Sequence, residues 1–314
     1  MRSDRTPQFL LAMLAVVLVG GYFLPLWAQF LLTIALAKGL VVLGLLPLMR
    51  TGLVSFGQAL YYCLGAYAGG ALGLQFGITD LFLMMLAGGV SAGVLAALLG
   101  FLLAKYRGIF FGLLSLALSM ILYGLLVKTE SLGSTDGFNV EQFTLFGVRP
   151  DQPMVRYSML VAAAVVCTGA ALALHRYLGT PLGLMAPAIR DNEIRVEYMG
   201  GSARYAIHVI YIIGATLAGA AGALVAAAVG HIDPEMAYWT QSGEFVFIAI
   251  LAGTGSVIAP FLGAVIFGVI HSFAFDFSPN TWQMVLGTAL LLIIVFLPSG
   301  LWSLFGRRFK ANEG

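Results

Sequence analysis

Apolar runs about as long as a lipid bilayer is thick recur along nearly the whole chain, and this feature limits its possible folds most. A transmembrane helix needs about 20 predominantly apolar residues, and two of the runs are shorter than that. We expect an all-α polytopic membrane protein of about ten transmembrane helices, in which the two short ones either cross fully or re-enter as broken helices. The predicted helices are 9–27, 30–49, 53–74, 81–104, 109–127, 157–175, 207–229, the short pair 244–258 and 260–276, and 282–304.

The composition excludes several classes of protein. Hydrophobic residues make up 60% of the chain and charged residues only 10%. Soluble domains are about 45–50% apolar and about 25% charged, so a soluble enzyme, a disordered protein and a nucleic-acid-binding protein are excluded. The predicted helices use most of the 314 residues, so we expect residues 1–314 to form a single transmembrane domain in contact with lipid.

The distribution of basic residues predicts how the helices are oriented, because cytoplasmic loops carry an excess of Lys and Arg. With both termini in the cytoplasm, twelve basic residues lie inside and three outside. The longest inner connection is then 176–206, and 128–156 is an external loop. The inner residues are Arg2, Arg5, Arg50, Lys105, Arg107, Arg176, Arg190, Arg195, Arg204, Arg307, Arg308 and Lys310, and the outer ones are Lys128, Arg149 and Arg156.

Sequence motifs for catalysis and for ATP hydrolysis are absent. No lysine follows a GxxxxG run, and the four histidines are scattered without metal-ligand spacing. We therefore expect no enzymatic activity, no bound cofactor and no metal site. An ion-driven carrier would hold ionisable groups inside its spans, and Lys38 is the clear mid-span charge. Lys38 is either a counter-ion for a substrate carboxylate, or it packs at a helix interface or pairs with backbone carbonyls.

Polar side chains at helical spacing are the candidates for a transport pathway. One stripe lies in the run 53–74 and a second lies in the run 109–127. Such hydroxyl and amide groups either hydrogen-bond neighbouring helices or contact a zwitterionic solute transiently. The pathway candidates are Ser55, Gly57, Gln58 and Tyr62 in the first run, and Ser115, Ser119 and Tyr123 in the second.

Glycines fall inside the predicted spans rather than between them. Gly57, Gly65, Gly69, Gly70 and Gly73 lie in the third run, and Gly214, Gly219 and Gly222 lie in the seventh. Since lipid tails are as apolar as the helices, there is no hydrophobic drive between helices, and small residues allow the close backbone approach that replaces it. We expect these glycines to be helix-packing sites.

The inner connection 176–206 contains a short helix rich in charges of both signs. The helix is predicted over about 187–199, with Pro187 in its first turn and Gly200 after its end. A charged helix on the inner side of a membrane domain either docks on a soluble partner or is solvated.

Six segments of this chain carry recognisable sequence motifs. They are GLVSFGQALYYCLGAYAGG at 52–70, YRGIFFGLLSLALS at 106–119, STDGF at 134–138, GLMAPAIRDNEIRVEYMGG at 183–201, IIGATLAGAAGAL at 212–224 and LAGTGSVIAPFLGA at 251–264. In this order they resemble the inner-membrane permease subunits of bacterial ABC importers for branched-chain amino acids. The long N-terminal lead and the RGIFF block resemble the M-type more than the H-type member of the permease pair.

The resemblance implies which partners supply what this chain lacks. Two ABC ATPase subunits would bind ATP-Mg, a second related permease would complete the pore, and an external substrate-binding protein would deliver the solute. The short charged helix at about 187–199 would be the coupling helix that contacts the ATPase, and the external loop 128–156 would receive the binding protein. On this resemblance the coupling residues are Arg190, Asp191, Asn192, Glu193 and Gly200, and the receptor-docking residues are Asp136 and Gly137.

The function implied by the resemblance is import of branched-chain amino acids across the bacterial cytoplasmic (inner) membrane. A permease for urea, short amides or other amino acids is the first alternative. A self-sufficient secondary carrier or channel is the alternative from a different class.

Overall fold

A computed structural model describes residues 6–151, 154–277, 284, 287–288, 291–292, 295–296 and 300–303. These residues form ten α-helices, two 3-10 turns and two short strands. The helices are α1 (Thr6–Phe23), α2 (Leu26–Arg50), α3 (Gln58–Phe76), α4 (Leu81–Leu103), α5 (Gly108–Lys128), α6 (Val155–Leu178), α7 (Pro181–Tyr198), α8 (Ala203–Val229), α9 (Trp239–Ala252) and α10 (Ala259–Phe277). The other elements are η1 (Glu130–Leu132), β1 (Phe138–Asn139), β2 (His231–Ile232) and η2 (Pro234–Ala237).

Nine of the predicted apolar helices correspond to helices of the structure, and the predicted helix 282–304 lies outside the continuously described residues. Seven helices are long and apolar enough to cross a membrane, namely α1, α2, α4, α5, α6, α8 and α10. α9 falls short because it has 14 residues, about 21 Å. Of the predicted short pair, the second helix, α10, has 19 residues and belongs to the set of seven. The three helices outside the set are α3, α7 and α9.

Polar caps and glycines mark the ends of several helices. The Asp80 carboxylate accepts hydrogen bonds from the first turn of α4, and the Ser202 hydroxyl accepts one from the first turn of α8. Gly77 and Gly230 follow α3 and α8 in the left-handed conformation, with φ of 66° and 77°. Glycine adopts this conformation without a steric penalty, so it ends a helix sharply.

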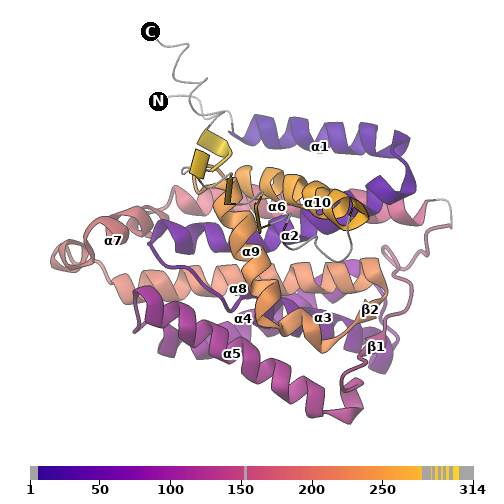
Figure 1. Cartoon of the computed structure of the whole chain (residues 1–314), viewed down its shortest axis with the longest axis horizontal. Coiled ribbons are helices and arrows are strands. Elements are labelled where there is room, and N and C mark those ends of the chain that lie inside the picture. The colour runs from indigo at the N-terminus through magenta and orange to yellow at the C-terminus, as the bar shows by residue number, and fades with distance from the viewer. Residues whose placement is uncertain are drawn as a thin grey trace, which may run out of the picture.

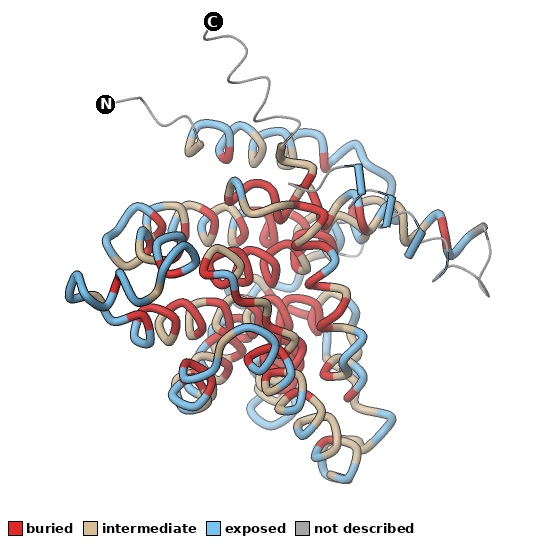
Figure 2. The backbone as a smooth tube through the Cα atoms, turned by 60° about the vertical axis from the view of Figure 1, so that its left-hand side comes forward, coloured by how far each residue is buried: buried red, intermediate tan, exposed pale blue. Residues whose placement is uncertain are grey.

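The core is built around α8, which packs most extensively against α4, α3 and α2. Figure 2 shows the buried backbone in the middle of the bundle, whereas α1, next to the N-terminus, is largely exposed. A Cβ on Gly65 would lie 2.1 Å from the Gly219 carbonyl oxygen, and one on Gly222 would lie 1.8 Å from the Tyr62 carbonyl oxygen. A Cβ on Gly44 would lie 2.7 Å from the carbonyl oxygen of Gly214. The packing role is confirmed for Gly65, Gly214, Gly219 and Gly222. It is not confirmed for Gly73, whose Cβ would meet only Ile78 and Thr79, at 3.8 Å.

The helix predicted over 53–74 begins later, at Gln58, because residues 53–57 are not helical. The chain turns at Gly52, which has a φ of 80°. Gln58 then lies beside Gly214, near the middle of α8, since a Cβ on Gly214 would be 3.6 Å from the Gln58 amide nitrogen. α3 therefore starts about halfway along its neighbour, and the non-helical segment 51–57 covers the remaining length.

α9 also starts beside the middle of another helix. The Ser119 hydroxyl, near the middle of α5, donates a hydrogen bond of 2.8 Å to the carbonyl oxygen of Ala237, two residues before α9. The helix predicted from 244 thus begins five residues earlier, at Trp239, and ends before Gly253 rather than at 258.

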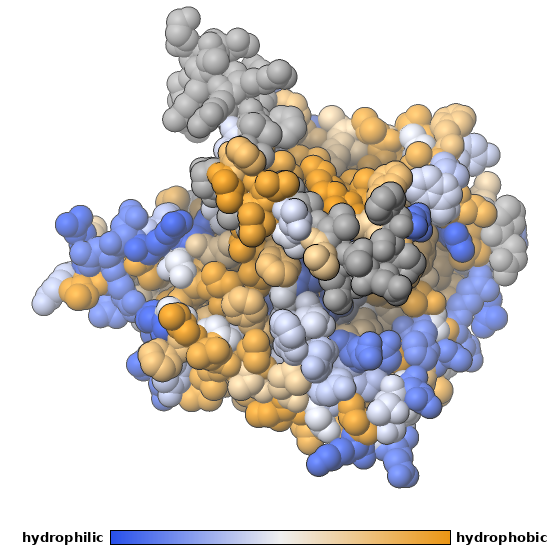
Figure 3. Space-filling model, viewed as in Figure 1, coloured by the Kyte–Doolittle hydropathy of each residue, from blue (hydrophilic) through white to orange (hydrophobic). Residues whose placement is uncertain are grey.

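The two polar ends of the bundle are distinct. In Figure 1, α7 lies at the left-hand end and the β1–β2 ribbon lies at the right-hand end. Figure 3 shows hydrophilic residues gathered at both of these ends, with a largely hydrophobic zone between them. β1 pairs with β2 in antiparallel register, Phe138 opposite Ile232 and Asn139 opposite His231, which joins the predicted external loop to the chain after α8.

We predict that Gly219→Ala destabilises the protein. A Cβ at this position would lie 2.3 Å from the Gly88 carbonyl oxygen and 2.4 Å from the Ala92 Cβ, so α4 and α8 must separate. Overpacking of this kind costs about 1–3 kcal/mol. The midpoint of thermal unfolding in detergent should fall, whereas it should stay or rise in Gly169→Ala, a control on α6 whose Cβ meets no atom within 4 Å. Equal midpoints for the two variants would contradict the packing interpretation.

Candidate functional site

A cluster of buried serines joins α3, α5 and α9 at the start of α3. The Ser115 hydroxyl accepts a hydrogen bond of 3.0 Å from the Phe56 N–H and donates one of 2.8 Å to the Gly112 carbonyl. The Ser242 hydroxyl on α9 accepts one of 3.0 Å from the Ala59 N–H. Non-helical backbone inside a membrane must find partners within the protein, and these hydroxyls supply them. The structure also brings together Gly57 and Ser115, one from each predicted stripe, because a Cβ on Gly57 would lie 2.7 Å from the Ser115 carbonyl oxygen.

Ser55 is not part of a helical stripe, because it lies in the non-helical segment before α3. It is fully buried, and its hydroxyl accepts a hydrogen bond of 3.2 Å from the Gly57 N–H. Gln58 is also fully buried, and both polar atoms of its side chain lack a hydrogen-bond partner within the described part of the chain. Tyr62 is buried with its ring edge-on to that of Phe245 at 5.2 Å.

A cavity of about 620 Å³ lies beside this cluster, and we call it the outer cavity. Of the predicted pathway residues, Tyr123 lines it, and its ring lies 5.1 Å from that of Tyr238. The other lining residues all come from the chain around η2 and the start of α9. They are Asp233, Glu235, Met236, Tyr238, Thr240 and Gln241.

The lining of the outer cavity carries negative charge. Asp233 contributes a buried carboxylate oxygen, Oδ1, that has no hydrogen-bond partner among the described residues. Glu235 is exposed at the same cavity. The positive end of α9 begins beside these carboxylates at Trp239. A cavity lined by carboxylates and a helix N-terminus can contact groups of both signs.

Lys38 forms an ion pair with Glu244, which joins α2 to α9. The other oxygen of Glu244 accepts a hydrogen bond of 3.1 Å from Gln241, a residue of the outer cavity. Lys38 itself lines a different cavity, of about 460 Å³, between α2 and α10. The structure therefore separates Lys38 from the serine cluster and gives it a carboxylate partner instead of the backbone carbonyls considered above.

The charged inner helix differs from its prediction in length and shape. α7 begins at Pro181, with Thr180 as its N-cap, rather than at 187. It is interrupted at Asn192, whose φ of −163° and ψ of 99° are extended. The Asn192 side chain accepts a hydrogen bond of 2.9 Å from the Arg195 N–H, so it caps the second part of the helix. A competing cap inside the charged run explains why one continuous helix does not form.

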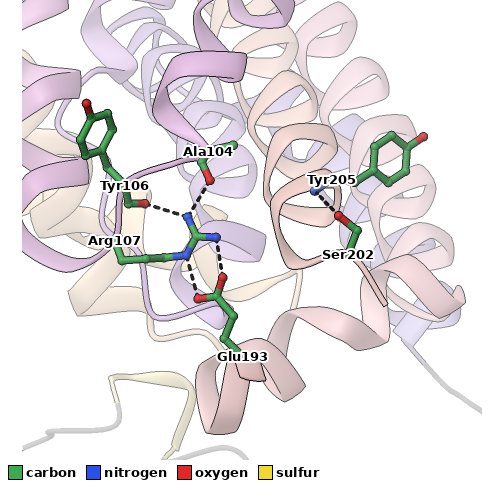
Figure 4. A network of polar contacts seen from close by, with 6 residues as sticks. All are labelled: Ala104, Tyr106, Arg107, Glu193, Ser202 and Tyr205. Atoms are coloured by element: carbon green, nitrogen blue, oxygen red, sulfur yellow. Dashed lines mark hydrogen bonds and ion pairs between the residues drawn. The ribbon is translucent and has the colours of Figure 1, made fainter. Parts of the chain in front are cut away.

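The predicted coupling residues of α7 lie in different environments. Arg190, Asp191 and Asn192 are exposed, and Gly200 ends the helix region with a φ of 85°. Glu193 is instead bound within the chain, because its carboxylate accepts hydrogen bonds from Arg107 (Figure 4).

The two predicted receptor-docking residues also lie in different environments. Asp136 is exposed and lies two residues before β1, the strand at the end of the molecule opposite α7. Gly137 has a φ of 65°, and a Cβ on it would lie 1.8 Å from the Ile232 carbonyl oxygen. Gly137 thus allows the external loop to pack on β2.

Sequence reasoning missed several residues of this region. Asp233, Glu235 and Gln241 lie in a polar stretch that we assigned to a loop, and Glu244 was placed at the end of a span. Their polar side chains directly before the apolar run 244–258 were the signal from which they could have been identified. Among the described residues, no group of three or more His, Cys, Asp or Glu side chains could hold a metal ion.

Comparison with known proteins identifies the family. The family described as "Branched-chain amino acid transport system / permease component" matches residues 27–295. The high-affinity branched-chain amino acid transport system permease protein LivM of Salmonella typhimurium is 27% identical, and the match covers 98% of this chain and 77% of that protein. The LivH permease protein of Escherichia coli is 24% identical over 80% of this chain and 85% of its own length. No solved structure matches the chain.

The resemblance seen in the sequence is confirmed along most of the chain, and the seven long apolar helices agree with a multi-pass membrane protein. The chain therefore belongs to the family of branched-chain amino-acid ABC transporter permeases.

Proposed function

We propose that this chain is one of two permease subunits of an ABC importer that moves branched-chain amino acids across the bacterial inner membrane. A second, related permease completes the membrane part, and two ATP-binding subunits hydrolyse ATP-Mg. An external binding protein delivers the solute. The names of the relatives support this proposal, because LivM and LivH are both permease proteins of high-affinity branched-chain amino acid transport systems.

The exposed surface of α7 is the observation that carries this proposal. Ile194, Tyr198 and Met199 are 65%, 89% and 82% exposed, next to the charged residues Arg190 and Asp191. Large apolar side chains that project from a charged helix at a polar end of the bundle are unfavourable in water and mark a contact with another protein. This surface supports docking over solvation, and an ATP-binding subunit is the partner that the family implies.

The outer cavity is the proposed entrance for the solute. An amino acid carries an ammonium group, which Asp233 and Glu235 attract, and a carboxylate, which the positive end of α9 attracts. Urea and short amides lack this pair of charges, so the lining favours a zwitterion over them. From this cavity the solute passes Ser119 and then Ser115 of the serine cluster when α5 and α9 separate.

The external loop is the proposed contact for the binding protein. Asp136 is exposed there, and its neighbour Phe138 pairs with Ile232, the residue before Asp233 of the outer cavity. A binding protein seated on this loop would therefore release its ligand directly above the entrance.

We predict that ATP-driven uptake requires the whole complex. In proteoliposomes, leucine should accumulate when both permeases, the ATP-binding subunits, the binding protein and ATP are present, and it should not accumulate with this chain alone. Accumulation driven by a proton or sodium gradient with this chain alone would favour a secondary carrier and contradict the proposal.

We predict that the double substitution Tyr198→Asp and Met199→Asp weakens binding of the ATP-binding subunit by about 10–100-fold, because the few hot-spot residues at the centre of an interface each contribute about 2 kcal/mol or more. Affinity can be measured on purified subunits in detergent, with thermal unfolding as a check of folding. Val148→Asp is the matched control, since Val148 is also exposed (69%) but lies in the external loop. Undiminished affinity in the double variant would remove α7 as the docking surface.

We predict that Asp233→Asn combined with Glu235→Gln lowers leucine uptake at low concentration by about 10–100-fold. Hydrogen bonds to charged groups are worth about 1.5–3 kcal/mol, and the ammonium group would lose both carboxylate partners. Asp151→Asn, which neutralises an exposed carboxylate of the external loop outside the cavity, is the control. Uptake that is equally fast in the double variant would place the solute path elsewhere.

A further inference from the structure

Arg107 and Glu193 join α5 to α7 through a two-pronged ion pair. The Arg107 Nε donates to Glu193 Oε2 at 2.8 Å, and the Arg107 Nη2 donates to Glu193 Oε1 at 2.6 Å. Figure 4 shows the edge of the guanidinium turned toward the two carboxylate oxygens. The remaining nitrogen, Nη1, donates to the carbonyl oxygens of Ala104 and Tyr106 at 2.7 and 2.9 Å. A planar guanidinium can make all these bonds at once, whereas a lysine ammonium cannot.

Both partners stand at positions where the chain changes direction. Arg107 is the residue before α5 and has extended φ and ψ, and Gly108 follows with a φ of 55°. Glu193 follows the interruption of α7 at Asn192, so it begins the second part of that helix. A carboxylate at a helix N-terminus is stabilised by the helix dipole. The ion pair therefore connects the start of one helix to the break in another.

α5 is held more loosely by the other helices than α8 is, and its outward side is exposed. Its contacts with the rest of the bundle include Ser115, bonded to Phe56, and Ser119, bonded to Ala237. Because α5 has few packing contacts, little packing resists its displacement when a neighbour bonded to its end moves. The ion pair fixes its inner end to α7.

α7 also contacts the non-helical segment 51–57, which leads to the serine cluster. The Arg190 side chain packs on Gly52, since a Cβ there would lie 3.4 Å from the Arg190 Cγ. The chain after Gly52 leads to Phe56, whose N–H bonds to Ser115. α7 thus contacts both segments that converge on Ser115, one through packing and one through the ion pair.

We propose that Arg107 and Glu193 are positioning residues that make α5 follow α7, so that displacement of α7 by an ATP-binding subunit moves Ser115 and Ser119 and opens or closes the path. This inference rests on the proposed function, and it assigns Glu193 to a contact within the permease rather than to the ATP-binding subunit. Arg107 is the residue that gives α5 this connection.

The test uses the complete reconstituted complex and four variants: Glu193→Gln, Arg107→Lys, the charge exchange Arg107→Glu with Glu193→Arg, and the control Lys105→Gln, which removes an exposed charge from the same turn. The single variants should raise the ATP hydrolysed per leucine transported at least 10-fold, with unchanged affinity for the ATP-binding subunit. The charge exchange should restore the ratio to within about 3-fold of the original complex, and the control should not change it.

A second readout separates coupling from folding. Spin labels at Leu125 on α5 and Val90 on α4, both exposed, report the distance between these helices. ATP should change this distance in the original complex and in the charge exchange, but not in Glu193→Gln. If the original complex shows no ATP-driven uptake, the proposed function fails. If it does, any of three results overturns the link: single variants with a normal ratio and movement, a loss of ATPase affinity in Glu193→Gln, or a charge exchange that does not restore coupling.

Discussion

Close backbone contact around α8 is the constraint on which the rest of the structure depends. Helices in lipid associate through van der Waals contact and hydrogen bonds, and glycine allows the shortest approach. Gly65 on α3 and Gly88 on α4 both reach the backbone of Gly219. These contacts hold α3 in place although it begins only halfway along α8. Because α3 is held there, the non-helical chain before it reaches α5, and the serine cluster can form.

The existence of most helices could be predicted from the apolar runs, but their starting points could not. The run from Leu53 is apolar, yet α3 begins at Gln58 because backbone N–H groups near its start bond to side chains of other helices. The Phe56 N–H bonds to Ser115, 59 residues away, and the Ala59 N–H bonds to Ser242, 183 residues away. Partners at such separations leave no trace in a local hydrophobic pattern.

The residues of the candidate site could be predicted from the sequence where they lie on a regular helix. Ser115 and Ser119 could be identified from their spacing because α5 is continuous through both. Asp233 could not, because it belongs to an irregular segment in which periodicity carries no information. The Arg107–Glu193 pair joins residues 86 positions apart, and the break at Asn192 that positions Glu193 depends on a side-chain cap in competition with a continuous helix.

The serines of the cluster have a structural role that is separate from the transport role proposed for this region, and it limits how the protein can change. Ser55 and Ser115 accept hydrogen bonds from N–H groups of the non-helical residues before α3, and Ser242 accepts one from the first turn of α3. Alanine at these positions would leave a backbone N–H without its hydrogen-bond acceptor, whatever the effect on the solute. Evolution or engineering of a new cargo preference should therefore leave the serines alone and act on side chains without structural obligations, such as Thr240 at the cavity wall.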